Sequence, residues 1–178
     1  MVLSNKQSNA LLKELYQGKS TEYQQKLAIR NLTMTNLMLR AGLRTVEVVE
    51  LLITDLLVAD KPLETLNLIR GIPQGRNART VLLNENIRLG IGQMNEYWWK
   101  LDREKPGNFA FYDKSPLRHI SVSQFRRIIN KAGLNALGYP VKPNLLRRTC
   151  AVNLFQKTDR QTVRRCLDYK TDQDWFFY

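Results

Sequence analysis

Apolar residues recur at helical spacing along most of the chain. Residues 20–40 fit one helix that starts at Ser20 or Thr21 and ends at Gly42. Residues 46–57 are apolar on most sides, which predicts a second helix that is buried rather than half exposed.

The C-terminal half shows a clearer helical pattern. A helix capped by Ser121 or Ser123 carries apolar residues on one face (Phe125, Ile128, Ile129 and Ala132) and basic residues on the other (Arg126, Arg127 and Lys131). Further helices are expected to start at Pro143, at Thr158 or Asp159, and at Thr171.

One region resembles a pair of strands. Residues 65–69 and 80–83 are expected to pair, joined by a loop over residues 70–77 that is rich in turn residues and arginine. Residues 84–101 then predict a helix that ends in Tyr97-Trp98-Trp99, and these aromatic residues are expected to pack into the core rather than to stack on bases. The predicted fold is therefore mainly α with a small antiparallel β-sheet, in a single domain over residues 1–178 with residues 1–19 as a lead-in.

Charge changes this picture from a helical domain to a candidate binder of polyanions. The chain has 28 Lys plus Arg against 16 Asp plus Glu, a net charge of +12, which makes nucleic acid the leading partner. A membrane surface or a ribosome would also attract such a protein. No apolar run approaches the roughly 18 residues that a membrane span needs. We expect a protein of the cytoplasm, associated with the nucleoid.

Metal and disulfide chemistry are disfavoured. His119 is the only histidine, and no acidic or Cys/His set has the spacing of metal ligands, so no metal or cofactor is expected. Cys150 and Cys166 both fall in predicted helices, where small core residues are the simpler interpretation.

Several motifs occur in an order that is more specific than any one of them. The run AGLRTVEVVEL at residues 41–51 is followed by Thr54-Asp55-Leu56, then by a basic hairpin ending in RTVLL at residues 79–83. SVSQFRRIINKAG at residues 121–133 comes next, followed by PNLLRRT at residues 143–149 and by Leu167-Asp168-Tyr169. Tyr178 ends the chain nine positions after Tyr169 (178 minus 169).

From residue 20 to residue 178 the chain resembles the catalytic domain of the tyrosine recombinase, or phage integrase, family. The resemblance implies that Tyr178 is the nucleophile that forms a 3′-phosphotyrosine with DNA, and that Arg44 and Arg147 hold the phosphate. Glu47 would orient Arg44. Leu117-Arg118-His119 also matches the Leu-Arg-His motif that contains the second arginine in the family. It lies before the helix over residues 121–133 rather than after it, so His119 is interpreted as an ordinary residue.

Three positions depart from the family pattern. Gln74 stands where the family usually has a catalytic lysine, Asn144 replaces a His or Lys, and Tyr169 replaces a His or Trp. Asn144 and Tyr169 can hydrogen-bond to phosphate, whereas Gln74 cannot act as a general acid. Three readings stay open: an active or slow recombinase, a degenerate relative that only binds DNA, and a basic helical protein of unrelated function.

Basic side chains around these positions are expected to contact double-stranded DNA. They are Arg70, Arg76, Arg79, Lys142, Arg148 and Lys170. The hairpin arginines among them are expected to touch phosphates from a loop. Self-association as a dimer or tetramer on DNA is implied by the resemblance. The residues before Ser20 are too few for the DNA-clamping domain of many members, so we expect either a fragment or a minimal single-domain member.

Overall fold

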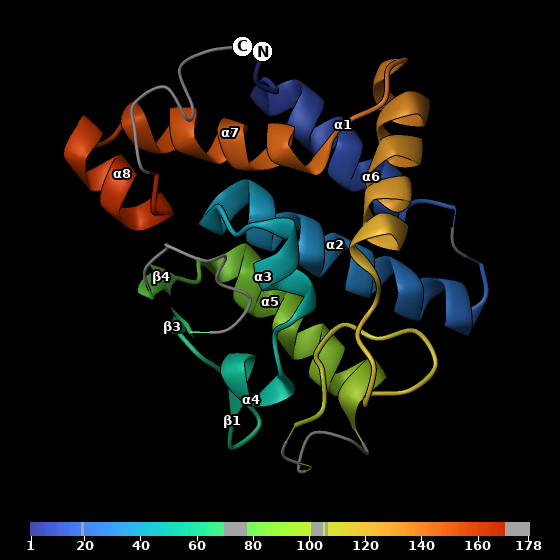
Figure 1. Ribbon diagram of the computed structural model, residues 1–178. Helices are drawn as coiled ribbons and strands as arrows, with labels where there is room; N and C mark the ends of the chain where they lie inside the picture. Colours follow the sequence, from blue (N-terminus) through green and yellow to red (C-terminus); the bar gives the residue numbers. More distant parts are fainter. Residues whose placement is uncertain (19, 70–77, 101–104, 106, 170–178) are drawn as a thin grey trace.

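Figure 1 shows a mainly helical structure in which a long helix, α2, passes through the centre. It is a computed structural model that describes residues 1–18, 20–69, 78–100, 105 and 107–169. The helices are α1 (Asn5–Tyr16), α2 (Glu22–Ala41), α3 (Thr45–Val49), α4 (Ile53–Leu56), α5 (Glu85–Met94), the π-helix η1 (Asn95–Trp99), α6 (Val122–Leu137), α7 (Pro143–Phe155) and α8 (Arg160–Leu167). The strands are β1 (Leu57–Val58), β2 (Lys61–Pro62), β3 (Thr65–Leu68) and β4 (Arg79–Leu82).

Helix α2 organises the core. It begins at a capping box on Thr21 and ends at Gly42, whose left-handed backbone (φ 67°) closes the helix as the sequence predicts. Its C-terminal half is buried on nearly every side, because α1, α5 and α7 all pack against it. The main hydrophobic cluster therefore surrounds α2, and a smaller one lies between α7 and α8 around Ala151, Val163 and Leu167.

The predicted helix over residues 46–57 is wrong in its continuity. The chain forms α3, breaks at Leu51 and Leu52, and resumes as α4. The break arises from a distant segment, since the Leu51 carbonyl accepts from the Ala110 amide and Leu52 forms a β-bridge with Phe109. The apolar run is buried as expected, but its backbone hydrogen bonds go partly to another part of the chain.

The predicted hairpin is confirmed, with small changes in its bounds. Strands β3 and β4 pair antiparallel from Thr65 with Leu82 to Leu68 with Arg79. The loop that joins them, residues 70–77, lies outside the described residues. A second short antiparallel pair, β1 with β2, was not expected from the sequence.

The helix expected over residues 84–101 changes type midway, from α5 to the π-helix η1. Trp99 is fully buried and donates its indole N–H to the Ala110 carbonyl at 2.8 Å. Trp98 packs against Tyr112 and under the buried guanidinium of Arg30. The two tryptophans pack in the core as the sequence predicts, but the prediction is wrong for Tyr97, which is 47% exposed.

The sequence predicts the helices of the C-terminal half better than the helix at the N-terminus. The segment expected as a lead-in forms the capped helix α1, which packs on α2 and α6 and buries Leu11 and Leu15. Helices α6, α7 and α8 start at Ser121, Lys142 and Asp159 caps and agree with the predicted pattern. The helix expected at Thr171 lies outside the described residues.

Candidate functional site

A buried carboxylate, Glu47, lies where α3, β4 and α7 meet. Its side chain is 0% exposed and forms ion pairs with three arginines that come from different elements. Arg44 Nη1 is 2.7 Å from Glu47 Oε1, and Arg79 forms a two-pronged pair at 2.6 Å and 2.8 Å. Arg147 Nη1 lies 4.0 Å from Glu47 Oε2. Glu47 thus fixes three cations that are far apart in the sequence.

Local structure explains the positions of Arg44 and Glu47. Arg44 is the N-cap of α3, and the Glu47 carboxylate accepts from the Arg44 backbone amide at 2.6 Å as well as from its guanidinium. An acidic residue in the first turn also suits the positive end of a helix. The predicted Arg44–Glu47 contact is present, and the spacing of three residues makes it a local one.

Arg147 is held by main-chain carbonyls. Its guanidinium donates to the carbonyls of Gly42 and Leu167, which end α2 and α8. These helix ends approach closely at Gly42, where a Cβ would lie 2.3 Å from Leu167 Cδ2. Glycine is needed here because the backbone has a positive φ and because Leu167 leaves no room for a Cβ. The Gly42 carbonyl then points at Arg147.

Burial and charge shift the pKa of two members of this cluster. Burial of the Glu47 carboxyl would raise its pKa, but the ion pairs with Arg79 and Arg44 outweigh burial, and the pKa lies below its ordinary value. Burial lowers the pKa of the Arg147 guanidinium, which Tyr169 opposes and Arg44 and Arg79 reinforce. An arginine stays protonated at neutral pH even so, and the cluster remains cationic.

A second carboxylate, that of Asp168, also contacts Arg44. Arg44 Nη2 lies 2.9 Å from Asp168 Oδ2 and 2.8 Å from the Asp168 carbonyl oxygen. Asp168 is the C-cap of α8 and has a left-handed backbone with φ 50° and ψ 52°. This conformation directs its main-chain oxygen and its carboxylate to the same guanidinium.

Two residues of this cluster, Arg44 and Arg147, line a cavity of about 370 Å³ that opens to the surface. Four residues expected to act together line it: Arg44, Asn144, Arg147 and Tyr169. The two arginines therefore open onto one cavity, although they are far apart in the sequence. Arg126 and Arg148 line the same cavity and add further positive charge to it.

Tyr169 covers Arg147. The Arg147 guanidinium carbon lies 4.8 Å from the centre of the Tyr169 ring, which is a cation–π contact. Burial raises the pKa of the Tyr169 hydroxyl above its ordinary value despite the nearby arginines. The hydroxyl is therefore protonated at neutral pH and can donate a hydrogen bond.

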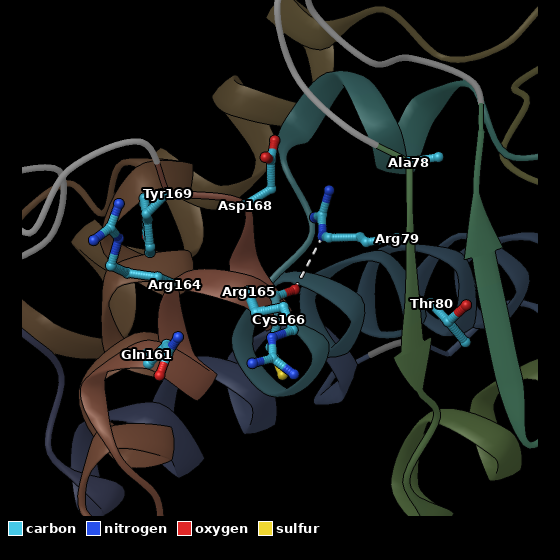
Figure 2. Close-up of a pocket in the computed structure, with 9 residues that line it drawn as sticks. All are labelled: Ala78, Arg79, Thr80, Gln161, Arg164, Arg165, Cys166, Asp168 and Tyr169. Carbon is cyan, nitrogen blue, oxygen red and sulfur yellow. Dashed lines mark hydrogen bonds between the residues drawn. The ribbon is translucent and has the colours of Figure 1, made fainter.

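Figure 2 shows a neighbouring cavity of about 600 Å³ between β4 and α8. Arg79, Asp168 and Tyr169 line it together with Arg164 and Arg165 of α8. The hydrogen bond from Arg79 Nε to the Cys166 carbonyl, at 3.0 Å, joins the strand to the helix. Tyr169 lines both cavities.

The predicted position of Arg79 on an exposed loop is wrong. The sequence places it on a loop open to phosphate, but it is the first residue of β4 and its side chain is 6% exposed. The reason is long-range, since the buried Glu47 carboxylate requires cationic partners and Arg79 supplies both prongs of one pair. Arg79 is a structural member of the site.

The other predicted site residues divide into two groups. Arg148 lines the 370 Å³ cavity, and Lys142 is exposed at the start of α7. Tyr178, Gln74, Arg70, Arg76 and Lys170 lie outside the described residues. His119 packs its ring edge against Phe109, as expected for an ordinary residue.

Sequence reasoning missed Asp168, Arg126, Arg164 and Arg165 as members of the site. The signal for Asp168 was its acidic side chain in the middle of Leu167-Asp168-Tyr169. Arg126 falls on the predicted polar face of α6, and nothing in that pattern shows what the face lies against. In the described part of the chain, no group of three or more His, Cys, Asp or Glu could hold a metal ion. None of the helices described there combines the length and apolar character needed to cross a membrane.

Solved structures similar to this one are recombinases and integrases. XerA recombinase superposes with a TM-score of 0.74 at 18% identity, over 96% of this chain and 57% of that one. XerH recombinase bound to its difH substrate gives 0.70 at 18%, over 96% and 47%. Tn1549 transposon integrase in complex with transposon right end DNA gives 0.71 at 14%, over 100% and 62%.

The chain therefore has the fold of a recombinase catalytic domain, and it spans about half the length of the structures that it resembles. Residues 1–175 match the model of the phage integrase family, and the chain belongs to that family. No curated protein matches the sequence significantly.

Proposed function

We propose that this protein is a site-specific DNA recombinase or integrase that cleaves and rejoins DNA through a 3′-phosphotyrosine intermediate. The observation that carries the proposal is the shared cavity of Arg44 and Arg147, with Asn144 and Tyr169 on its wall. Family membership supports the same reading. Nothing local in the sequence obliges the two arginines to meet, so their meeting indicates a common ligand.

The chemistry needs stabilisation of a highly charged phosphorus centre. The Tyr178 hydroxyl attacks the phosphorus and its proton leaves to a base. The bond to the 5′-oxygen breaks, and that oxygen takes up a proton from water. This step gives a 3′-phosphotyrosine and a 5′-hydroxyl. One phosphoester bond forms as another breaks, so no ATP is required. Arg44 and Arg147 carry several fixed N–H donors each and would hold the non-bridging oxygens as charge develops.

Glu47 would act as a positioning residue. It is too deeply buried to contact DNA, and its two oxygens are shared among the arginines. Asn144 and Tyr169 would donate hydrogen bonds to the phosphate from the rim of the cavity. Neither carries a positive charge, so they would stabilise the phosphate less than charged residues do.

A second candidate function is DNA binding without turnover. The uncharged Asn144 and Tyr169 in the cavity favour it, as does Gln74 at the expected position of the general acid. Loss of a general acid or base commonly costs a factor of about 10²–10⁴ in rate. Such a loss would leave the basic surface, and therefore DNA binding, intact.

Double-stranded DNA is the proposed partner in both cases, with self-association as a dimer or tetramer on the DNA. The net charge of +12 and the arginine-lined cavities support DNA binding. XerH and Tn1549 integrase, which share the fold, are themselves seen with DNA. Association with the nucleoid in the cytoplasm would follow from this activity.

The test is covalent capture on a nicked duplex made from the DNA that flanks the gene. After cleavage the short strand diffuses away, so the phosphotyrosine accumulates and appears as a shifted band on a denaturing gel. We expect a band with the native chain and none with Tyr178→Phe, which differs by one hydroxyl. Salt-sensitive binding by both proteins without a band would support the binding module and contradict the recombinase.

A further inference from the structure

The two carboxylates that contact Arg44 differ in access. Glu47 is 0% exposed and lies beneath the arginines, where no phosphate can reach it. Asp168 is 12% exposed and lines the 600 Å³ cavity between β4 and α8. Its carboxylate therefore pairs with Arg44 from this cavity, whereas Arg44 itself lines the neighbouring 370 Å³ cavity.

The Asp168 carboxylate is not required to position Arg44. Arg44 Nη1 is already fixed by Glu47 at 2.7 Å, and Arg44 Nη2 donates to the Asp168 main-chain oxygen at 2.8 Å. Both contacts survive the loss of the carboxylate. What the carboxylate adds at 2.9 Å is a negative charge. Three arginines then share two carboxylates in place of one, which halves the excess positive charge of the cluster.

Helix α8 gains nothing from an acidic residue at this end. Asp168 is the C-cap, where the partial negative charge of the helix disfavours a carboxylate. Its left-handed backbone is also one that Gly and Asn adopt at least as readily. The ion pair with Arg44 therefore favours an aspartate at a position where the helix end does not.

We propose that the Asp168 carboxylate, through its ion pair, competes with a DNA phosphate for the charge of Arg44. Asp168 is then an autoinhibitory residue that weakens binding of the scissile phosphate in the free protein. This inference rests on the proposed function, because it takes the ligand of Arg44 to be a DNA phosphate. Removal of the charge should make one more arginine available to DNA.

The test compares Asp168→Asn with the native chain for binding to a fluorescent duplex at several salt concentrations. Asparagine keeps the shape and tolerates the left-handed backbone but removes the charge. We expect about fivefold tighter binding. We also expect a salt dependence steeper by about 0.9, the contribution of one added phosphate contact. Asp168→Gly, which suits the same backbone, should give the same gain if the asparagine variant folds poorly.

The matched control is Asp60→Asn. Asp60 is an exposed aspartate with φ 61°, located at the turn between β1 and β2. The substitution makes the same change in net charge at another residue with a positive φ, and β1, which leads into this turn, lies away from α8 (Figure 1). We expect its binding to change less than twofold. The gain from Asp168→Asn should also disappear in an Arg44→Gln background, because the charge would then have no arginine to release.

The outcomes separate the inference from the proposed function. Equal binding by Asp168→Asn and Asp60→Asn, or weaker binding by Asp168→Asn, would overturn the inference while DNA binding itself stands. If none of the proteins binds duplex DNA, the proposed function fails first. A gain that is specific to position 168 and depends on Arg44 supports both.

Discussion

Arg44, Arg79 and Arg147 form a cluster around Glu47, and charged groups play different roles on its inner and outer sides. On the inner side, Glu47 and the carbonyls of Gly42 and Leu167 engage Arg79 and Arg147 in contacts with almost no exposure to water. On the outer side, Arg44 is 16% exposed and shares a cavity with Arg126, Asn144 and Tyr169. The inner contacts fix geometry and the outer groups remain accessible. Substitutions on the two sides should therefore separate stability from DNA binding.

The largest expected effect is on the inner side. Glu47→Gln leaves Arg79 and Arg147 buried without their counter-charge, and such a loss costs about 3–5 kcal/mol of folding free energy. Chemical denaturation of the variant and the native chain measures it. Glu50→Gln is the control, because Glu50 lies on the same short helical segment and bears the same charge; its cost should stay within about 0.5 kcal/mol.

The pH dependence of the same pair sharpens this prediction. The fold lowers the pKa of Glu47, so its contribution is present above the unfolded-state pKa of about 4.3 and is lost as pH falls through the lower folded pKa. The stability gap between native chain and Glu47→Gln should therefore shrink only in acid. A gap that is absent at neutral pH would contradict the inner role of Glu47.

The next effect tests how the helix ends hold Arg147. Gly42→Ala forces a Cβ to 2.3 Å from Leu167 Cδ2 in a left-handed backbone, for an expected cost of about 2–4 kcal/mol. Gly138→Ala is matched, since Gly138 is also a left-handed C-cap (φ 78°) but has open space around its Cβ position. We expect about 1–2 kcal/mol there. Equal losses of thermal stability in Gly42→Ala and Gly138→Ala would show that the close approach of Gly42 to Leu167 contributes nothing to stability.

The smallest effect on stability belongs to the outer side. Arg126→Gln removes an exposed charge from the cavity rim, so unfolding should change by less than about 0.5 kcal/mol. DNA affinity should fall a few-fold, with a salt slope shallower by about 0.9. Arg127→Gln, an exposed neighbour on α6, is the control for net charge. If both variants bind DNA equally, the cavity does not face the DNA.

Features that depend on local sequence could be predicted. Gly42 ends α2, Ser121 caps α6, and Glu47 meets Arg44 because three residues of helix separate them. The burial of Trp99 follows from its size and apolar character. In each case the reason lies within about one turn of the residue.

Features that depend on distant partners could not be predicted from the sequence. The break at Leu52 requires Phe109, and the burial of Arg79 requires Glu47. The residues next to Leu52 and Arg79 in the sequence therefore indicate neither feature. Arg79 looks like a surface arginine because a strand's first residue gives no sign of a buried carboxylate opposite. The pairing of Asp168 with Arg44 is of the same kind, since only the fold brings α8 to the start of α3.

The most direct test of the central claim identifies the residue that becomes linked to DNA. The covalent product on the nicked duplex is digested with protease and nuclease, and the modified peptide is identified by mass spectrometry. We predict a nucleotide adduct on the C-terminal peptide at Tyr178, absent from an Arg44→Gln, Arg147→Gln double variant that still folds. An adduct on another tyrosine, or an undiminished yield in the double variant, would contradict the assignment of Arg44 and Arg147 to one scissile phosphate.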